Sequence, residues 1–329
     1  MKRREFISLL GGAAAAGSIT LVVPARAQQT GKVPRIGILT PAENDTTPIF
    51  EAFRKGLRDL GYVEGKTIVL DFRFAKGNND ALAGLAAELV RIPVDAMVVD
   101  STSAIRAAMD ATRTVPIVIG AGGDPVHLGF VASISRPGGN VTGMTIRGET
   151  LSSKRLELLK QAFPRIASVT VLMNPKNVST PLSLNATEEA ARTLGIHVVP
   201  LATSTPRELQ AINSADLTRS DALAVLPDAM FWNHRSTIIA VAQKARWPAI
   251  YPEREYADDG GVIAYGPSIP DSFRRAAAYV GRILRGTKPG DLPIDEPAKF
   301  DFIVNLRTAR SLGFSISPDF LSAAGEVIE

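Results

Sequence analysis

The 329-residue sequence contains no cysteine, which excludes disulfide bonds, thiolate catalysis and a lipid anchor attached to cysteine. It has three histidines, His127, His197 and His234, and none has a second potential ligand at the spacing of a known metal motif. We therefore expect neither a metal centre nor a bound cofactor.

The common catalytic motifs are missing as well. No serine lies in a Gly-x-Ser-x-Gly nucleophile turn. The glycines at 120–123 lack the six-residue spacing of a dinucleotide-binding loop, and Pro125 follows where a helix would have to open. The adjacent acids Asp258 and Asp259 precede two glycines, which is typical of a solvated turn. Because catalysis needs positioned acids, bases or nucleophiles, we expect a protein that is not an enzyme.

Positive charge is concentrated at the N-terminus. The net charge is +4, but residues 1–27 hold four basic residues against Glu5, so about one positive charge remains beyond them. That balance leaves no basic surface for nucleic acid. The composition, 45% hydrophobic and 21% charged, is typical of a folded protein, and the length suits two domains of ordinary size.

Residues 1–27 have the pattern of an export signal. Lys2, Arg3 and Arg4 precede an apolar stretch of small residues at 6–23, and Ala25-Arg26-Ala27 fits a cleavage site after Ala27. Arg3-Arg4-Glu5-Phe6-Ile7 resembles a twin-arginine signal, although an ordinary secretory signal and a retained membrane helix are alternatives. We expect a periplasmic protein whose signal is cleaved, with no stable membrane insertion afterwards.

The most informative stretch, residues 94–125, reads as strand, helix and strand. The apolar run at 96–99 is followed directly by Ser101, Thr102 and Ser103, which are good helix N-caps. A second apolar run at 117–119 ends in a glycine loop. Two parallel strands joined by one helix place both loops at the carboxyl edge of the sheet, where α/β proteins bind ligands. Free N–H groups at the start of the helix favour an anion such as a carboxylate.

Strand and helix patterns alternate through both halves of the chain, which indicates an α/β fold with two parallel sheets flanked by helices. In the first half we expect strands at 35–40, 67–74, 96–99, 117–119 and 141–145. In the second half we expect them at 168–173, 196–201, 222–226, 248–251, 260–266 and 299–305, with a long helix at 271–285.

Several short motifs carry a resemblance to a known family. Gly-Asp-Pro-Val stands at 123–126 and Arg-Pro-Gly-Gly-Asn-Val-Thr-Gly at 136–143. Tyr-Gly-Pro at 265–267 is followed by Arg274-Arg275-Ala276-Ala277, and Asp-Leu-Pro-Ile at 291–294 precedes Lys299-Phe300. Together they resemble the substrate-binding proteins of ABC transporters, in the family that includes tryptophan- and tyrosine-binding members.

The resemblance implies a two-lobed periplasmic-binding-protein fold of type I, with three crossover segments acting as hinges. We assign residues 33–146 and 254–294 to the first lobe and residues 147–253 and 295–329 to the second. We expect the crossovers at 144–148, 253–264 and 294–298.

The resemblance also implies a ligand site in the cleft between the lobes. Ser101, Thr102 and Ser103 would hold an amino-acid carboxylate, or alternatively form only a helix cap. Gly122 and Asp124 would belong to the next cleft loop, or form only a tight turn in which Asp124 caps locally. The other expected ligand contacts are Pro41 and Asn44, with a solvent loop as their alternative, and Met144, Thr145, Asn174, Asn177, Asp228 and Tyr265.

The segment after Asp228 departs from the family pattern. Many members continue with small and polar residues, whereas this chain has Ala229-Met230-Phe231-Trp232-Asn233. Phe231 and Trp232 either pack in the core or form an aromatic wall of the site. Asp228 itself could pair with a ligand ammonium group. Tyr265 and Tyr251 end strands, so packing and ligand contact are both open for them.

We therefore predict an exported solute-binding component of an ABC importer. It would capture an amino acid or a related small organic acid and deliver it to a permease in the inner membrane. A monomer that binds no nucleic acid is expected. The alternatives are an exported ligand sensor on the same fold that docks a receptor, and a secreted α/β enzyme.

Overall fold

Two β-sheets organise the chain in the computed structural model, which describes residues 32–146, 148–212 and 220–329. Residues from Val33 onward form one compact unit. The predicted export signal lies outside the described residues. Among the helices that the structure describes, none is both long and apolar enough to cross a membrane.

The first sheet has five parallel strands in the order β2-β1-β3-β4-β5. Its strands are β1 (Arg35–Thr40), β2 (Val69–Phe74), β3 (Ala96–Asp100), β4 (Ile117–Ala121) and β5 (Val141–Gly143). Its helices are α1 (Pro48–Asp59), α2 (Leu82–Arg91) and α3 (Thr102–Ala111), and a short 3-10 helix spans Asn79–Ala81.

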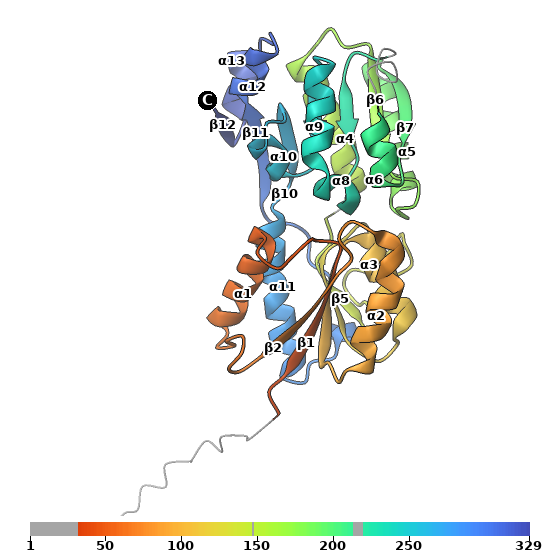
Figure 1. Ribbon diagram of the computed structural model, residues 1–329, viewed down its shortest axis with the longest axis vertical. Coiled ribbons are helices and arrows are strands. Elements are labelled where there is room, and N and C mark those ends of the chain that lie inside the picture. The colour runs from red at the N-terminus through yellow and green to blue at the C-terminus, as the bar shows by residue number, and fades with distance from the viewer. Residues whose placement is uncertain (1–31, 147, 213–219) are drawn as a thin grey trace, which may run out of the picture. The chain divides into compact units, whose positions relative to one another are not determined.

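Both faces of the first sheet are buried because its strand side chains alternate between two cores. Ile36, Ile38 and Val98 pack towards one core, whereas Met97 and Val99 pack towards the other. Figure 1 shows α1 and α11 (Ile269–Leu284) on one side of this sheet and α2 and α3 on the other. Near-continuous apolar strands are the expected pattern for a sheet covered on both faces.

The helix α11 reaches the first sheet from far along the chain. Phe273 lies edge-on to Phe50 and Phe53 of α1, with ring centroids 5.7 and 6.4 Å apart. The two helices approach so closely at Gly56 that a Cβ there would lie 2.5 Å from the carbonyl oxygen of Arg274. Glycine at this position is therefore a packing requirement.

The second sheet has seven strands in the order β12-β11-β10-β9-β8-β6-β7, and only β10 and β11 are antiparallel among its described pairs. The strands are β6 (Ser168–Met173), β7 (His197–Ala202), β8 (Leu223–Val225), β9 (Ala249–Tyr251), β10 (Ile263–Pro267), β11 (Phe300–Asn305) and β12 (Glu326–Ile328). The helices are α4 (Gly148–Ala162), α5 (Thr180–Leu194), α6 (Pro206–Ala211), α8 (Ala229–Asn233), α9 (Arg235–Lys244), α10 (Arg254–Asp258), α12 (Leu306–Ser311) and α13 (Pro318–Ala323). A 3-10 helix at Pro289–Asp291 lies with the first sheet, where the carbonyl oxygen of Gly290 accepts a hydrogen bond from the N–H of Gly138.

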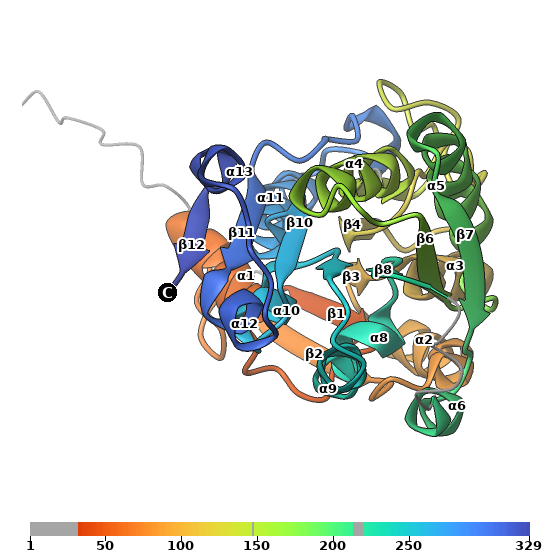
Figure 2. The same cartoon turned by 90° about the horizontal axis from the view of Figure 1, so that it is seen from above.

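Helices cover both faces of the second sheet too. Leu156 and Leu159 of α4 pack into one core, and Ile238 and Ile239 of α9 pack into the other. Figure 2 shows α4 and α9 on opposite sides of this sheet. The predicted α/β architecture with two sheets is confirmed.

The chain passes between the two sheets after β5, between β10 and α11, and between α11 and β11. The first and third passages coincide with the predicted crossovers at 144–148 and 294–298. The second was predicted at 253–264, but it lies at Ser268 instead. The reason is that β10 pairs with β9 and β11, so residues 254–267 belong with the second sheet and not with the first lobe. The other predicted lobe boundaries stay predictions.

Candidate ligand-binding cavity

A cavity with about 860 Å³ of empty space, counted out to its open mouth, is lined by loops from both sheets. Each of these loops follows the carboxyl end of a parallel strand. Residues 41–42 follow β1, residues 101–102 follow β3, and residues 122–123 follow β4. From the second sheet, lining residues follow β6, β8 and β9. This is the edge at which α/β sheets bind ligands.

Ser101 combines a helix cap with a strained backbone. Its φ is 94° and its ψ is 152°, a region that residues other than glycine rarely adopt, at a cost of about 1–3 kcal/mol. Its N–H donates to the carbonyl oxygen of Ala121 over 2.9 Å, and its Oγ accepts from the N–H of Ala104 over 3.2 Å. These bonds fix the turn from β3 into α3.

Thr102 joins the two first-sheet loops that line the cavity. Its Oγ1 accepts from the N–H of Gly123 over 3.1 Å. A Cβ on Gly123 would lie 3.1 Å from the Cβ of Ser179, so glycine allows the loops of the two sheets to approach at this point. Within the described part of the chain, the N–H groups of Thr102 and Ser103 have no protein acceptor. They therefore supply the two free donors that open α3.

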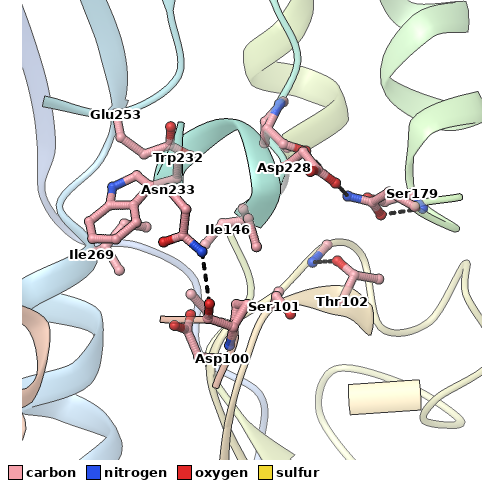
Figure 3. A pocket seen from close by; sticks show the side chains of 18 of the residues that line it. Asp100, Ser101, Thr102, Ile146, Ser179, Asp228, Trp232, Asn233, Glu253 and Ile269 are labelled. Carbon is pink, nitrogen blue, oxygen red and sulfur yellow. Dashed lines mark hydrogen bonds between the residues drawn. The ribbon is translucent and has the colours of Figure 1, made fainter. Parts of the chain in front are cut away.

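Asp228 is held by three hydrogen bonds at the start of α8. Its Oδ1 accepts from the N–H of Met230 over 2.9 Å. Its Oδ2 accepts from Asn174 Nδ2 over 3.2 Å and from Asn177 Nδ2 over 3.0 Å. Burial raises the pKa of Asp228, and these bonds oppose the rise without cancelling it. These three donors are neutral, so they orient the carboxyl group without supplying a positive charge to balance it. Figure 3 shows the Asp228 side chain extending towards Ser179.

Three more carboxylates line the same cavity. Burial raises the pKa of Asp100 to about 6, against the effect of a hydrogen bond from Thr40. Burial raises the pKa of Glu253 to about 8, and raises that of Glu255 as well. Of the residues described along the cavity wall, none is lysine, arginine or histidine. The cavity is therefore acidic.

An apolar surface completes the wall. Ile49, Ile146, Ile269 and the Trp232 ring line the cavity. The guanidinium of Arg235 stacks 4.7 Å from the centroid of that indole. The two alternatives for the aromatic pair after Asp228 both occur, because Trp232 lines the cavity while its neighbour Phe231 is fully buried in the second sheet's core.

Two polar contacts join the two halves near the cavity. Asn233 Nδ2 donates to the carbonyl oxygen of Pro41 over 2.7 Å, as Figure 3 shows. Lys176 forms an ion pair with Asp80 over 3.1 Å. Direct bonds therefore connect segments beside the first sheet to segments beside the second.

The structure brings about half of the predicted site residues to the cavity. The predicted residues that line it are Pro41, Ser101, Thr102, Gly122, Asn177 and Asp228. Their role in binding a ligand stays a prediction. Asn174 lies behind Asp228 as a hydrogen-bond donor, and Ser103 lies in the first turn of α3.

The remaining predicted residues lie elsewhere. Asn44 is exposed and accepts hydrogen bonds from Thr46, and Asp124 caps the backbone of its own turn at Val126 and His127. Asn44 therefore lies in a solvent loop and Asp124 caps its own turn, as the alternatives to ligand contact predicted. Met144 is buried in the core, and the Thr145 hydroxyl lies 3.3 Å from the carbonyl oxygen of Gly123. The Tyr265 ring packs on Phe300 and Phe302.

The sequence prediction missed much of the acidic and apolar wall. Glu253 and Glu255 follow β9 in the same way that Asp228 follows β8, so the rule that found Asp228 could have found them. Ile146 and Ile269 come from the crossover segments, and no sequence pattern marks them as lining residues. The other missed lining residues are Ala42, Ile49, Asp100, Ala121, Gly148, Ser179, Ser183, Pro227, Ala229 and Asn233.

Within the described ranges, no group of three or more histidine, aspartate or glutamate side chains is placed to hold a metal ion. The cavity instead offers hydrogen-bond donors at α3, carboxylates around its wall and an apolar surface. Such a set binds a small polar molecule that carries a positive charge.

The chain resembles known proteins in both sequence and fold. A family model described as ABC transporter substrate binding protein matches residues 35–328. A tyrosine-binding protein from Clostridioides difficile (strain R20291) is 28% identical over 263 residues, which cover 80% of this chain and 75% of that protein.

Two solved structures have similar folds. A conserved domain protein from Vibrio cholerae has a TM-score of 0.84 at 27% identity, covering 90% of this chain and 100% of that chain. An ABC domain in complex with L-Trp from Streptococcus pneumonia also has a TM-score of 0.84, at 23% identity and with the same coverage of 90% and 100%. Periplasmic binding proteins among more distant matches confirm the predicted type I fold.

Proposed function

The chain belongs to the family of ABC transporter substrate-binding proteins, and we propose that its ligand is an amino acid held in the acidic cavity. The family's function requires a small-molecule ligand and an ABC permease as partner. The observation that carries the ligand class is the placement of Asp228 opposite free N–H groups at the start of α3. An ammonium group fits the buried carboxylate, and a carboxylate fits the helix start.

The names of the relatives support this ligand class. The Clostridioides difficile relative is named a tyrosine-binding protein, and the Streptococcus structure holds L-Trp. A small organic acid without an amino group fits less well, because the wall presents carboxylates and its described residues include no basic side chain. We therefore narrow the sequence prediction to amino acids.

The mechanism that we propose is capture by differential affinity. A ligand that touches Ser101 and Thr102 on one sheet and Asp228 and Asn177 on the other gains all of its contacts only when the two halves are together. Binding then shifts the population towards that closed state, which the permease recognises. We further propose that the protein is a monomer, that it is exported to the periplasm, and that its signal is cleaved after Ala27. It would release its ligand chemically unchanged.

Native mass spectrometry of the chain purified from its host, followed by a thermal-shift screen of amino acids, tests this proposal. A ligand that binds only the folded state raises the melting temperature in proportion to the logarithm of its concentration above Kd. We expect a retained amino acid, or a shift with at least one amino acid and none with its deaminated 2-hydroxy or 2-keto analogue. An equal shift with the deaminated analogue would contradict the role of the amino group.

A further inference from the structure

The acids of the cavity lie in two separate places. Figure 3 shows Asp228 with Ser179 and Thr102 on one side, and Glu253 with Trp232 and Ile269 on the other. Glu255 lines the cavity two residues beyond Glu253. One ammonium group at Asp228 would leave the second pair of carboxylates without a partner from the ligand.

Glu253 has no counter-ion at contact distance in the described chain. Its Oε2 is buried and has no hydrogen-bond partner. Arg155 is the charge that acts most strongly on it; the Nε of Arg155 donates to the carbonyl oxygen of Tyr265 over 2.7 Å, and its buried Nη1 has no hydrogen-bond partner among the described residues. No ion pair within 4.0 Å joins Arg155 and Glu253. A buried carboxylate in this condition is costly unless something pairs with it.

The other nearby cation is already engaged. Arg235 Nε lies 2.8 Å from Asp259 Oδ2, and its Nη1 donates to the carbonyl oxygen of Trp232 over 3.0 Å. Burial raises the pKa of Glu255, and Arg235 and a hydrogen bond from the Trp232 side chain oppose that rise without cancelling it. Glu253 and Glu255 line the cavity, whereas Arg155 and Arg235 are not among its lining residues.

We propose that the cavity binds a ligand with two separated cationic groups, an amino group at Asp228 and a second amine or guanidinium at Glu253 and Glu255. This inference rests on the proposed function and names its ligand class as a basic amino acid. The apolar stem of such a ligand would lie along Ile146, Ile269 and the edge of Trp232. The carboxylate would take the free N–H groups at the start of α3.

Ligand binding would release protons. With its pKa near 8, Glu253 is largely protonated at neutral pH, and a ligand cation beside it lowers that pKa. The charged or titratable groups that act on Glu253 are Arg155, Glu255, Asp228, Arg235 and Tyr256, and none of them is a free cation in the cavity. The affinity for a basic ligand should therefore rise as pH increases from 6 to 8.

Two pairs of nearly isosteric ligands separate charge from shape. Isothermal titration of the chain purified from its host would compare L-arginine with L-citrulline and L-lysine with L-norleucine. A hydrogen-bonded charge pair is worth about 1.5–3 kcal/mol, so the basic member should bind at least about tenfold more tightly. Titrations in buffers of different ionisation enthalpy should show proton release with arginine and none with citrulline.

Substitutions at Glu253 and Glu255 test where the second cationic group of the ligand binds. Glu253→Gln and Glu255→Gln should each reduce the arginine-to-citrulline affinity ratio by about tenfold or more. Glu157→Gln is the matched control, because that glutamate lies on α4, pairs with Lys154 and does not line the cavity. Its ratio should stay unchanged. If Glu253→Gln lowers the melting temperature, Glu255→Gln and the wild-type ligand pairs still decide the outcome.

Two results would overturn this inference and leave the proposed function intact. One is equal binding of arginine and citrulline, and the other is tighter binding of a neutral aromatic amino acid than of any basic one. A flat pH profile for arginine would overturn the assignment of Glu253 as the partner. If no amino acid of any class binds, the proposed function itself fails and this inference fails with it.

Discussion

At Ser101 we predict that a glycine variant is more stable than an alanine variant, which reverses their usual order of stability. Its φ of 94° suits glycine, so Ser101→Gly removes a strain of about 1–3 kcal/mol, loses a few tenths of a kcal/mol of capping and costs about 0.5–1 kcal/mol of unfolded-state entropy. Ser101→Ala keeps the strain and loses the cap, at a cost of about 1 kcal/mol. We expect the free energy of unfolding of the glycine variant to exceed that of the alanine variant by about 0.7–3 kcal/mol.

Ser103 provides the matched control, since it lies two residues along in regular α3. There glycine should be less stable than alanine by up to about 1 kcal/mol. Urea unfolding followed by far-UV circular dichroism measures all four variants, with unchanged m-values confirming a common unfolded state. If Ser101→Ala is as stable as Ser101→Gly, or if both positions show the same order, the backbone at Ser101 is not strained and the reasoning fails.

Two further predictions concern packing and pH. Gly56→Ala should destabilise the protein by about 1–3 kcal/mol because its Cβ would meet the carbonyl of Arg274. Gly84→Ala in α2 has open space around it and should stabilise the protein by about 0.5–1 kcal/mol. Chemical denaturation of both variants measures these changes. Because the native pKa values of Asp100 and Glu253 lie above their ordinary values, the ligand-free protein should lose stability as pH rises through 6 and then 8, by up to about 1.4 kcal/mol for each pKa unit. Melting temperatures from pH 5 to 9 should show a smaller decline in Glu253→Gln, and an identical decline would contradict the assignment.

The sequence was most informative where strand pattern and loop chemistry coincide. The apolar run before Ser101 and the polar residues after it predicted both β3 and a cavity loop, because the carboxyl ends of parallel strands share one edge. The same rule placed Asp228 correctly after β8. It did not bring Asn44 to the cavity, because that side chain is exposed and accepts hydrogen bonds from Thr46 within its own loop.

Other features depend on which strands pair, and local pattern does not encode that. Assigning the segment after β9 to a crossover hid Glu253 and Glu255, although β9 itself was predicted. Tyr265 was expected near the ligand, but alternation along β10 turns its ring towards Phe302. Ile269 reaches the cavity only because α11 returns to the first sheet, which is a long-range contact that no local periodicity reveals.

The return of α11 has a consequence for how the chain becomes folded. Phe53 and Phe273 are 220 positions apart, yet both belong to the core of the first sheet. During synthesis, residues up to 143 can pair as strands long before the helix that covers one face of their sheet exists. That face is covered only by α1 until the second sheet's strand β10 has been made and α11 has followed it. We expect the first half alone, ending before α4, to expose Phe50 and Phe53 and to aggregate, so that the two halves reach the native state together.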